Sequence, residues 1–312
     1  MNDLYNAALL ALAWLAAVNA VLSLGAWVAA ASGGTRAASA AWLLALRLTP
    51  AAGSLIFVWL VFATWHWRLV PRGTDESFGV VVHLLAGVGA WLLARAAWRM
   101  TGALQAARHL RRCTALPRIE AGPDTDVFEV AGLTGVALAG VLRPRIFVGV
   151  SVRQVLTPGE LEAAVAHERA HGLFHDNWKR LAIACAPDLF GHTAAARQLE
   201  RQWSAMAECR ADARAVAGDS TRAANLASAL VKVARLGVTP PPTAAWSTLH
   251  DEPLIAERIQ RLLAGDAPAA PRPPRALIAA TWAGGLSGVA AAGALLAGEL
   301  HALTERVGHM LP

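Results

Sequence analysis

The sequence predicts a mostly helical membrane protein with four transmembrane helices and an α+β domain inserted between the third and the fourth. Two observations carry this prediction. Hydrophobic residues make up 55% of the 312 residues and charged residues only 16%, whereas soluble domains carry about 25% charged residues. The apolar residues also gather in four stretches, each long enough for a hydrocarbon core that takes about 20 helical residues to cross.

The four spans are expected at about residues 7–31, 40–65, 78–98 and 277–300. The first is a poor signal peptide, because Asp3 precedes it, no Lys or Arg does, and its apolar run is too long. In the second, Arg47 lies near one end and is expected to snorkel to the interface, while Pro50 is expected to kink the helix. Gly284 and Gly288 in the fourth have the G-x-x-x-G spacing that lets another helix approach closely.

Arginines near the span ends predict the orientation, because cytoplasmic flanks carry an excess of Lys and Arg. They follow the third span and precede the fourth, as Arg95, Arg99, Arg108, Arg111, Arg112, Arg272 and Arg275. Both termini are therefore expected outside the cell. We expect residues 1–98 to form three spans, 99–239 a cytoplasmic domain, 240–275 a Pro-rich linker with a short helix, and 276–312 the fourth span with a short outer tail.

The charge balance also bears on partners and source. The formal net charge is +6, but many of the basic residues flank apolar spans, which favours the lipid bilayer over direct contact with nucleic acid. Lysine occurs only at Lys179 and Lys232 in an Ala- and Arg-rich chain. This composition indicates a GC-rich bacterial genome, and the expected location is the bacterial cytoplasmic (inner) membrane.

Short β-prone runs and longer helices are expected in the inserted domain. Thr157 at the N-cap, Pro158 at the first helical position and Glu160 three residues after the cap predict the start of a helix. The other expected elements are strands at 127–130, 136–141 and 145–150 and helices at about 194–217, 223–236 and 255–263. The strand at 145–150 is predicted either as an edge strand that binds substrate or as an ordinary core strand.

The strongest chemical signal is the H-E-x-x-H sequence formed by His167, Glu168 and His171. Histidines at i and i+4 share one face of a helix, so both imidazoles can reach one tetrahedral Zn²⁺. Glu168 lies beside them and can act as the general base toward an attacking water. The motif therefore predicts a zinc site with hydrolytic chemistry.

A hydrolytic zinc site needs a third protein ligand and an open fourth position. Asn177 occupies the position six residues after His171 where metzincins have a third histidine. We therefore predict that Glu208, on the next long helix, is the third ligand. Asp212, one helical turn further on, is predicted to be the carboxylate that orients a ligand histidine.

The other histidines and the cysteines are not expected to bind the metal. His175 continues the i+4 spacing and is expected to rim the cleft or to pack, because a fourth protein ligand would close the site. His192 and His250 are interpreted as structural or surface residues. The three cysteines, at positions 113, 185 and 209, are too few for a disulfide framework or a Cys-based zinc site.

Over residues 140–215 the chain resembles the BlaR/MecR-type antirepressor metallopeptidases, membrane proteins that sense β-lactams and trigger cleavage of a transcriptional repressor. The resemblance is carried by residues 142–146, 157–171, 176–177 and 208–212, and the order of three spans, zinc domain and fourth span extends it. It implies a gluzincin-like fold, zinc on His167, His171 and Glu208, and Glu168 as the general base.

The family's β-lactam receptors carry a large extracellular penicillin-binding domain after the fourth span, whereas residues 301–312 alone follow it here. We therefore do not expect β-lactam sensing by this chain alone, and a sensor partner is possible. The expected substrate is a cytoplasmic protein, either a transcriptional repressor or the chain's own linker. Two alternatives are a housekeeping protease similar to the HtpX-like and CAAX-processing families, and a non-hydrolytic signalling scaffold with structural zinc. The sequence does not predict the oligomeric state.

Overall fold

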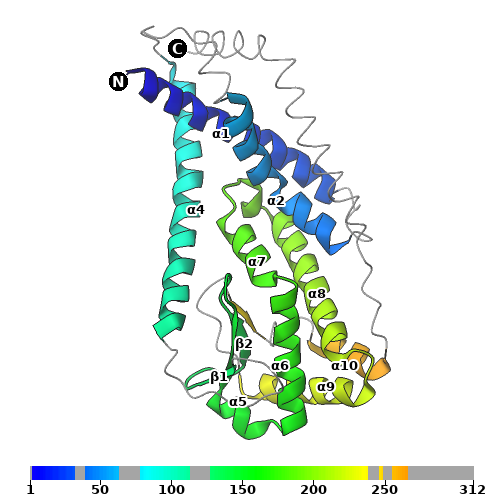
Figure 1. The fold of residues 1–312 in the computed structure, drawn as a ribbon. Helices are drawn as coiled ribbons and strands as arrows, with labels where there is room; N and C mark the ends of the chain where they lie inside the picture. The colour runs from blue at the N-terminus through cyan, green and yellow to red at the C-terminus, as the bar shows by residue number, and fades with distance from the viewer. Residues whose placement is uncertain are drawn as a thin grey trace. The chain divides into compact units, whose positions relative to one another are not determined.

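The computed structural model describes residues 2–31, 39–62, 78–112, 127–237, 246–248 and 255–265. Within these ranges the chain is mostly helical, with one small sheet (Figure 1). The fourth predicted span, most of the Pro-rich linker, Cys113 and His250 lie outside the described residues. The chain divides into two compact units, and residues 185–201 group with the first three spans rather than with the zinc-motif unit.

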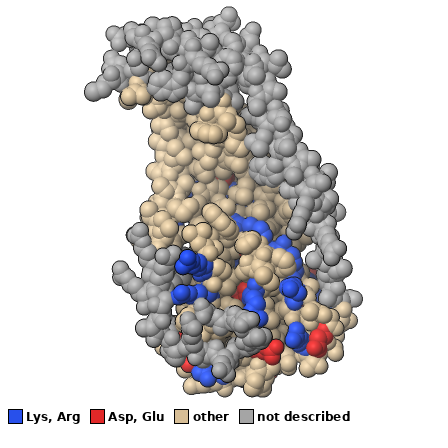
Figure 2. All heavy atoms as spheres, viewed as in Figure 1, with Lys and Arg blue, Asp and Glu red and all other residues tan. Residues whose placement is uncertain are grey.

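The first unit contains the apolar helices. Among the described residues, three helical stretches are long and apolar enough to cross a membrane. The first is Leu4–Ala31 within α1 (Asn2–Ala31), and the third is Val80–Ala106 within α4 (Val80–Arg112). The second, Ala40–Leu60, comprises α2 (Ala40–Ile56) and part of the π-helix η1 (Phe57–Phe62). These helices indicate a membrane protein and match the first three predicted spans. On the face seen in Figure 2 the surface over the upper part of α4 shows almost no charged side chains.

Close backbone packing holds α1 and α4 together. A Cβ at Gly89 of α4 would collide with the carbonyl oxygen of Leu12 in α1, so only glycine permits this approach. Leu10 and Ala13 of α1 are buried with Val82 and Ala86 of α4 at the same contact. The apolar sequence of the spans is therefore used partly for packing between helices.

Arg47 differs from the prediction. The sequence predicts that its side chain snorkels to the interface. In the structure Arg47 is only 4% exposed, and its guanidinium forms ion pairs within the first unit. The partners are Asp188 and Glu200, which come from residues 185–201. Because a buried charge is stable only when paired, these distant carboxylates remove the need to reach the membrane surface.

The second unit is an α+β unit built around a four-stranded sheet. Its strands are β1 (Val127–Val130), β2 (Val136–Ala139), β3 (Arg145–Gly149) and β4 (Trp246–Thr248), in the order β1-β3-β2-β4. β3 is parallel to β1 and antiparallel to β2, and β2 is antiparallel to β4. The run at 145–150 is thus a central strand, so its interpretation as an edge strand is wrong and its interpretation as a core strand is confirmed.

Helices pack against this sheet and against one another. They are α5 (Val150–Val155), α6 (Pro158–Leu173), α7 (Asp176–Cys185), α9 (Ser220–Arg235), α10 (Ile255–Ala264) and the part of α8 (Ala194–Val216) that follows Arg201. The core joins apolar residues of β1 to β3 with those of α6 and α9. The predicted helix starts and ends are largely confirmed, and α9 begins earlier than expected because Asp219 caps it.

Candidate metal centre

The helix that carries the H-E-x-x-H sequence is fixed at its N-terminus. The Thr157 hydroxyl accepts a hydrogen bond from the Glu160 backbone N–H, and the Glu160 carboxylate accepts one from the Thr157 N–H. Ser228 and Lys232 of α9 also donate to that carboxylate, at 2.6 and 2.8 Å. The capping box therefore starts α6 and also joins it to α9.

The two motif histidines and Glu208 meet in a buried cluster. The Nε2 atoms of His167 and His171 are 3.1 Å apart. Glu208 Oε2 lies 3.3 Å from His167 Nε2, and Glu208 Oε1 lies 3.4 Å from His171 Nε2. All three residues are buried, and their candidate ligand atoms lie within 4.8 Å of one another. α6 and α8 thus bring together the three residues that the sequence predicts as ligands.

These distances fit a tetrahedral metal ion. With a metal–ligand distance of about 2.0 to 2.1 Å, neighbouring ligand atoms of a tetrahedral zinc site are about 3.3 to 3.4 Å apart. The distance of 3.1 Å between the two Nε2 atoms is close to that value, as are the distances of 3.3 and 3.4 Å that join each Nε2 to a different oxygen of the Glu208 carboxylate. Two imidazoles and one carboxylate are also a donor set that catalytic zinc sites use. The residues therefore fit the ion that the motif implies.

Each motif histidine has a carboxylate at its other ring nitrogen. His167 Nδ1 lies 2.9 Å from Asp212 Oδ1, and His171 Nδ1 lies 3.0 Å from Asp176 Oδ2. The contact between His171 and Asp176 is a hydrogen bond, and the one between His167 and Asp212 is a close ion pair. Carboxylates at this ring nitrogen are how proteins orient metal-ligating histidines. Asp212 lies where the sequence analysis expects the orienting carboxylate. Asp176, which follows the turn after α6, makes the second such contact, and helical spacing does not predict it.

Glu168 is fully buried next to this cluster. Its Oε2 accepts a hydrogen bond from the backbone N–H of Leu138 in β2, at 3.0 Å. Asn177 donates to the carbonyl oxygens of Leu138 and Gly140, at 3.1 and 3.0 Å. Strand β2 is thus hydrogen-bonded to Glu168 and, through Asn177, to the start of α7. These hydrogen bonds hold the strand in place beside Glu168.

Two arginines balance the negative charge of Glu208. Arg258 of α10 is 1% exposed, and its Nη1 lies 3.1 Å from Glu208 Oε2. Its Nη2 and Nε donate to the two carboxylate oxygens of Asp212, at 2.7 and 2.9 Å. Arg180 of α7 donates to Glu208 Oε1 at 3.1 Å. Nothing in the spacing of Arg258 or Arg180 marks either residue in the sequence.

The cluster shifts the acid–base behaviour of its members. Burial by itself would raise the pKa of Glu208, but the His171 charge, the histidine hydrogen bonds and Arg258 hold it well below its usual value. Burial would likewise lower the pKa of His171, but the Glu208 charge and the hydrogen bond to Asp176 raise it to about 10. Glu208 is therefore ionised, as a ligand carboxylate must be, and metal binding would release a proton from His171.

His175 does not continue the motif face. α6 ends at Leu173, and His175 has a φ of 55° in the turn before α7. Its side chain is exposed, outside the buried cluster. His192 lies in the short helix η3 (Phe190–His192), and its ring centroid is 5.4 Å from that of Trp91. Neither His175 nor His192 belongs to the cluster of candidate ligands.

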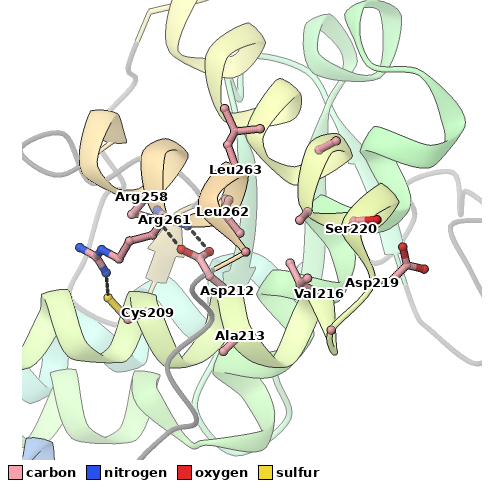
Figure 3. Close-up of a pocket in the computed structure, with 14 residues that line it drawn as sticks. Cys209, Asp212, Ala213, Val216, Asp219, Ser220, Arg258, Arg261, Leu262 and Leu263 are labelled. Atoms are coloured by element: carbon pink, nitrogen blue, oxygen red, sulfur yellow. Dashed lines mark hydrogen bonds and ion pairs between the residues drawn. The ribbon is translucent and has the colours of Figure 1, made fainter.

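A pocket of about 180 Å³ adjoins the centre on the side of Asp212 and Arg258 (Figure 3). Cys209 and Asp212 come from α8, Ser220 begins α9, and Arg258 and Arg261 come from α10. Figure 3 shows dashed lines that join Arg258 to the Asp212 carboxylate, and both residues line the pocket. His167, His171 and Glu208 do not line it, so the pocket lies behind the histidine-orienting carboxylate.

No family model, curated protein or solved structure matches the chain.

Proposed function

We propose that this chain is a membrane-integral zinc metalloendopeptidase. The observation that carries the proposal is the buried cluster of His167, His171 and Glu208 with Glu168 buried on the same helix as the two histidines. A purely structural zinc site has no use for a neighbouring carboxylate base, whereas peptide hydrolysis requires one. The donor–donor distances support zinc as the ion that these three residues hold.

The chain's own groups have distinct roles in this reaction. A bound zinc ion would act as a Lewis acid toward a peptide carbonyl and would acidify a water molecule. Glu168 would accept a proton from the attacking water and pass it to the nitrogen of the leaving amine. The Leu138 N–H, which donates to Glu168 Oε2, fixes the direction of this carboxylate. Asp176 would hold His171 in the tautomer that leaves Nε2 for the metal, and Asp212 would supply the negative charge beside His167 Nδ1.

The proposed substrate is a cytoplasmic protein. Arginines after the third span and before the predicted fourth span favour a cytoplasmic zinc unit and external termini, in a bacterial inner membrane. The resemblance to BlaR/MecR-type antirepressors favours regulated proteolysis of a transcriptional repressor, or cleavage of the chain's own linker. In such regulated proteolysis a separate sensor protein would supply the signal that starts cleavage.

A cleavage map of the host tests this assignment. The full chain and the Glu168→Gln variant would be expressed in a bacterial host, and new protein N-termini would be compared by mass spectrometry. We expect cleavage products that need Glu168, in a DNA-binding protein or within residues 240–275 of the chain itself. Products spread over many misfolded membrane proteins would instead favour an HtpX-like quality-control protease. No Glu168-dependent product at all would favour a signalling scaffold that binds zinc without hydrolysis.

A further inference from the structure

Three large apolar side chains of the second unit are exposed on two neighbouring turns. Leu142 is 79% exposed, Leu173 58% and Trp178 49%. Leu142 lies in the turn between β2 and β3, whereas Leu173 and Trp178 flank the turn between α6 and α7. These three residues are called the apolar tip below. They belong neither to the metal cluster nor to the pocket beside it, so the proposed function gives them no role.

The two turns are joined by contacts on either side of Leu142. The Asn177 side chain donates to the carbonyl oxygen of Gly140, at 3.0 Å. A Cβ at Gly172 would lie 4.0 Å from Pro144 Cγ, which is an ordinary van der Waals distance. Each residue of the apolar tip is within two residues of one of these contacts in the sequence, so the three side chains share one region of the surface.

The charge around the apolar tip is positive. Arg143 is exposed and Arg145 is partly buried, and neither has an acidic partner among the residues that the structure describes. Asp176 is the one acidic residue in the sequence ranges 140–146 and 172–180, and its carboxylate is buried and paired with two cations. The exposed side chains of the two turns therefore carry no negative charge.

A bilayer surface fits this combination better than a protein partner does. Tryptophan is enriched at the membrane–water interface, and anionic headgroups attract basic residues near the surface. A stable protein–protein interface takes about 20 to 30 residues from each partner, far more than the apolar tip offers. The apolar helices of the first unit belong to the same chain. A weak attraction to lipid suffices, because a covalent tether raises the effective concentration of the binding partner.

We propose that the apolar tip docks the second unit on the surface of a bilayer that contains anionic phospholipid. Leu142, Leu173 and Trp178 enter the headgroup region, and Arg143 and Arg145 face the lipid phosphates. The inference goes beyond the proposed function and requires neither zinc nor catalysis, because it concerns exposed residues outside the metal cluster. The second unit then has a reversible attachment to the membrane in addition to its covalent one.

Fluorescence quenching in lipid nanodiscs tests this docking on the full chain. Leu142→Cys, made in a background in which the three native cysteines are replaced by alanine, would carry the fluorophore NBD. A nitroxide on the headgroup of phosphatidylglycerol quenches a probe at the bilayer surface, and iodide quenches a probe in water. Val155→Cys is the matched control, because Val155 is also an exposed apolar residue, at 41%, and lies on α5 outside the apolar tip.

We expect the nitroxide lipid to quench the Leu142 probe and iodide to quench the Val155 probe. Arg143→Gln should lower the ratio of docked to undocked protein about fivefold, which corresponds to about 1 kcal/mol for one basic residue near an anionic surface. Nanodiscs of phosphatidylcholine should weaken the lipid quenching of the Leu142 probe for the same reason. Trp178→Ser should also weaken it, although this substitution removes no charge.

Three results would overturn the proposal. Equal quenching of the Leu142 and Val155 probes by iodide would place the apolar tip in water. Protection of the Leu142 probe from both quenchers would show that a protein surface, from this chain or from a second copy, covers the apolar tip. Equal lipid quenching of both probes would show a non-specific collapse of the unit on the bilayer. Gel filtration identifies variants that do not fold, and these are left out of the comparison.

Discussion

His171 Nδ1 lies 3.0 Å from Asp176 Oδ2, and both side chains are completely buried. Lys179 and Arg210 also bind this carboxylate through Asp176 Oδ1, at 3.0 and 2.7 Å. Burial would raise the pKa of Asp176, but the hydrogen bond to His171 and these two cations lower it to about 2. Asp176 is therefore ionised throughout the physiological pH range and fixes the ring of the second motif histidine.

Replacement of Asp176 should weaken metal binding without unfolding the unit. Asp176→Asn keeps the size of the side chain but removes the charge that fixes the His171 tautomer. We expect zinc affinity to fall about 10- to 100-fold, as measured with a competing chelator. Asp219→Asn is a suitable control, because asparagine also caps a helix, and it should bind zinc like wild type.

Arg258 should matter more for the metal-free protein than for the zinc-bound protein. Its guanidinium compensates two buried carboxylates, Glu208 and Asp212, and removal of one partner of a buried ion pair costs about 3 to 5 kcal/mol. Arg258→Met should therefore lower the melting temperature strongly when a chelator keeps the protein free of metal. Added zinc should restore much of the lost melting temperature. Arg261→Met on the same helix serves as the control. An equal response of Arg258→Met and wild type to zinc would contradict this account of the charge balance.

Glu160 should make stability depend on pH in the acidic range. Burial would raise its pKa, but the hydrogen bonds from Lys232, Ser228 and Thr157 lower it from 4.5 to about 2. The lowered pKa means that the ionised group stabilises the folded state above about pH 4.5 and that this contribution disappears as pH falls toward about 2. The shift corresponds to roughly 3 kcal/mol at neutral pH.

The measurement is the melting temperature of wild type and Glu160→Gln between pH 3 and pH 7. The variant should melt several degrees lower than wild type above pH 5, and the difference should shrink as the pH is lowered. Glutamine keeps the capping hydrogen bond, so the pH dependence isolates the charge. A difference that stays constant down to pH 3 would show that the carboxylate charge is not the stabilising feature.

The sequence predicted those parts of the centre that depend on one helix or on strong local signals. His167, Glu168 and His171 are placed by i+4 spacing, and Thr157 with Glu160 marks the start of their helix. The helical turn between Glu208 and Asp212 likewise brings Glu208 to both motif histidines and Asp212 to His167. Local periodicity suffices for such contacts because the helix itself fixes the relative positions of the side chains.

The contacts that were missed depend on tertiary structure. Arg258 meets Asp212 across 46 residues and Arg47 meets Asp188 across 141, and no local pattern encodes either pair. From the sequence β3 was equally compatible with an edge and a central position, because no local pattern encodes that β1 pairs with one side of it while β2 pairs with the other. The role of Asp176 depends on the turn after Leu173, which breaks the helical spacing.

The central claim is that His167, His171 and Glu208 hold zinc for a peptidase in which Glu168 is the base. Its most direct test is the zinc content and the self- or casein cleavage of the detergent-purified protein beside Glu168→Ala. We predict about one zinc per chain in both proteins, with cleavage by the wild type only. A variant that still cleaves would contradict the role of Glu168, and the absence of zinc from both preparations would contradict the metal centre itself.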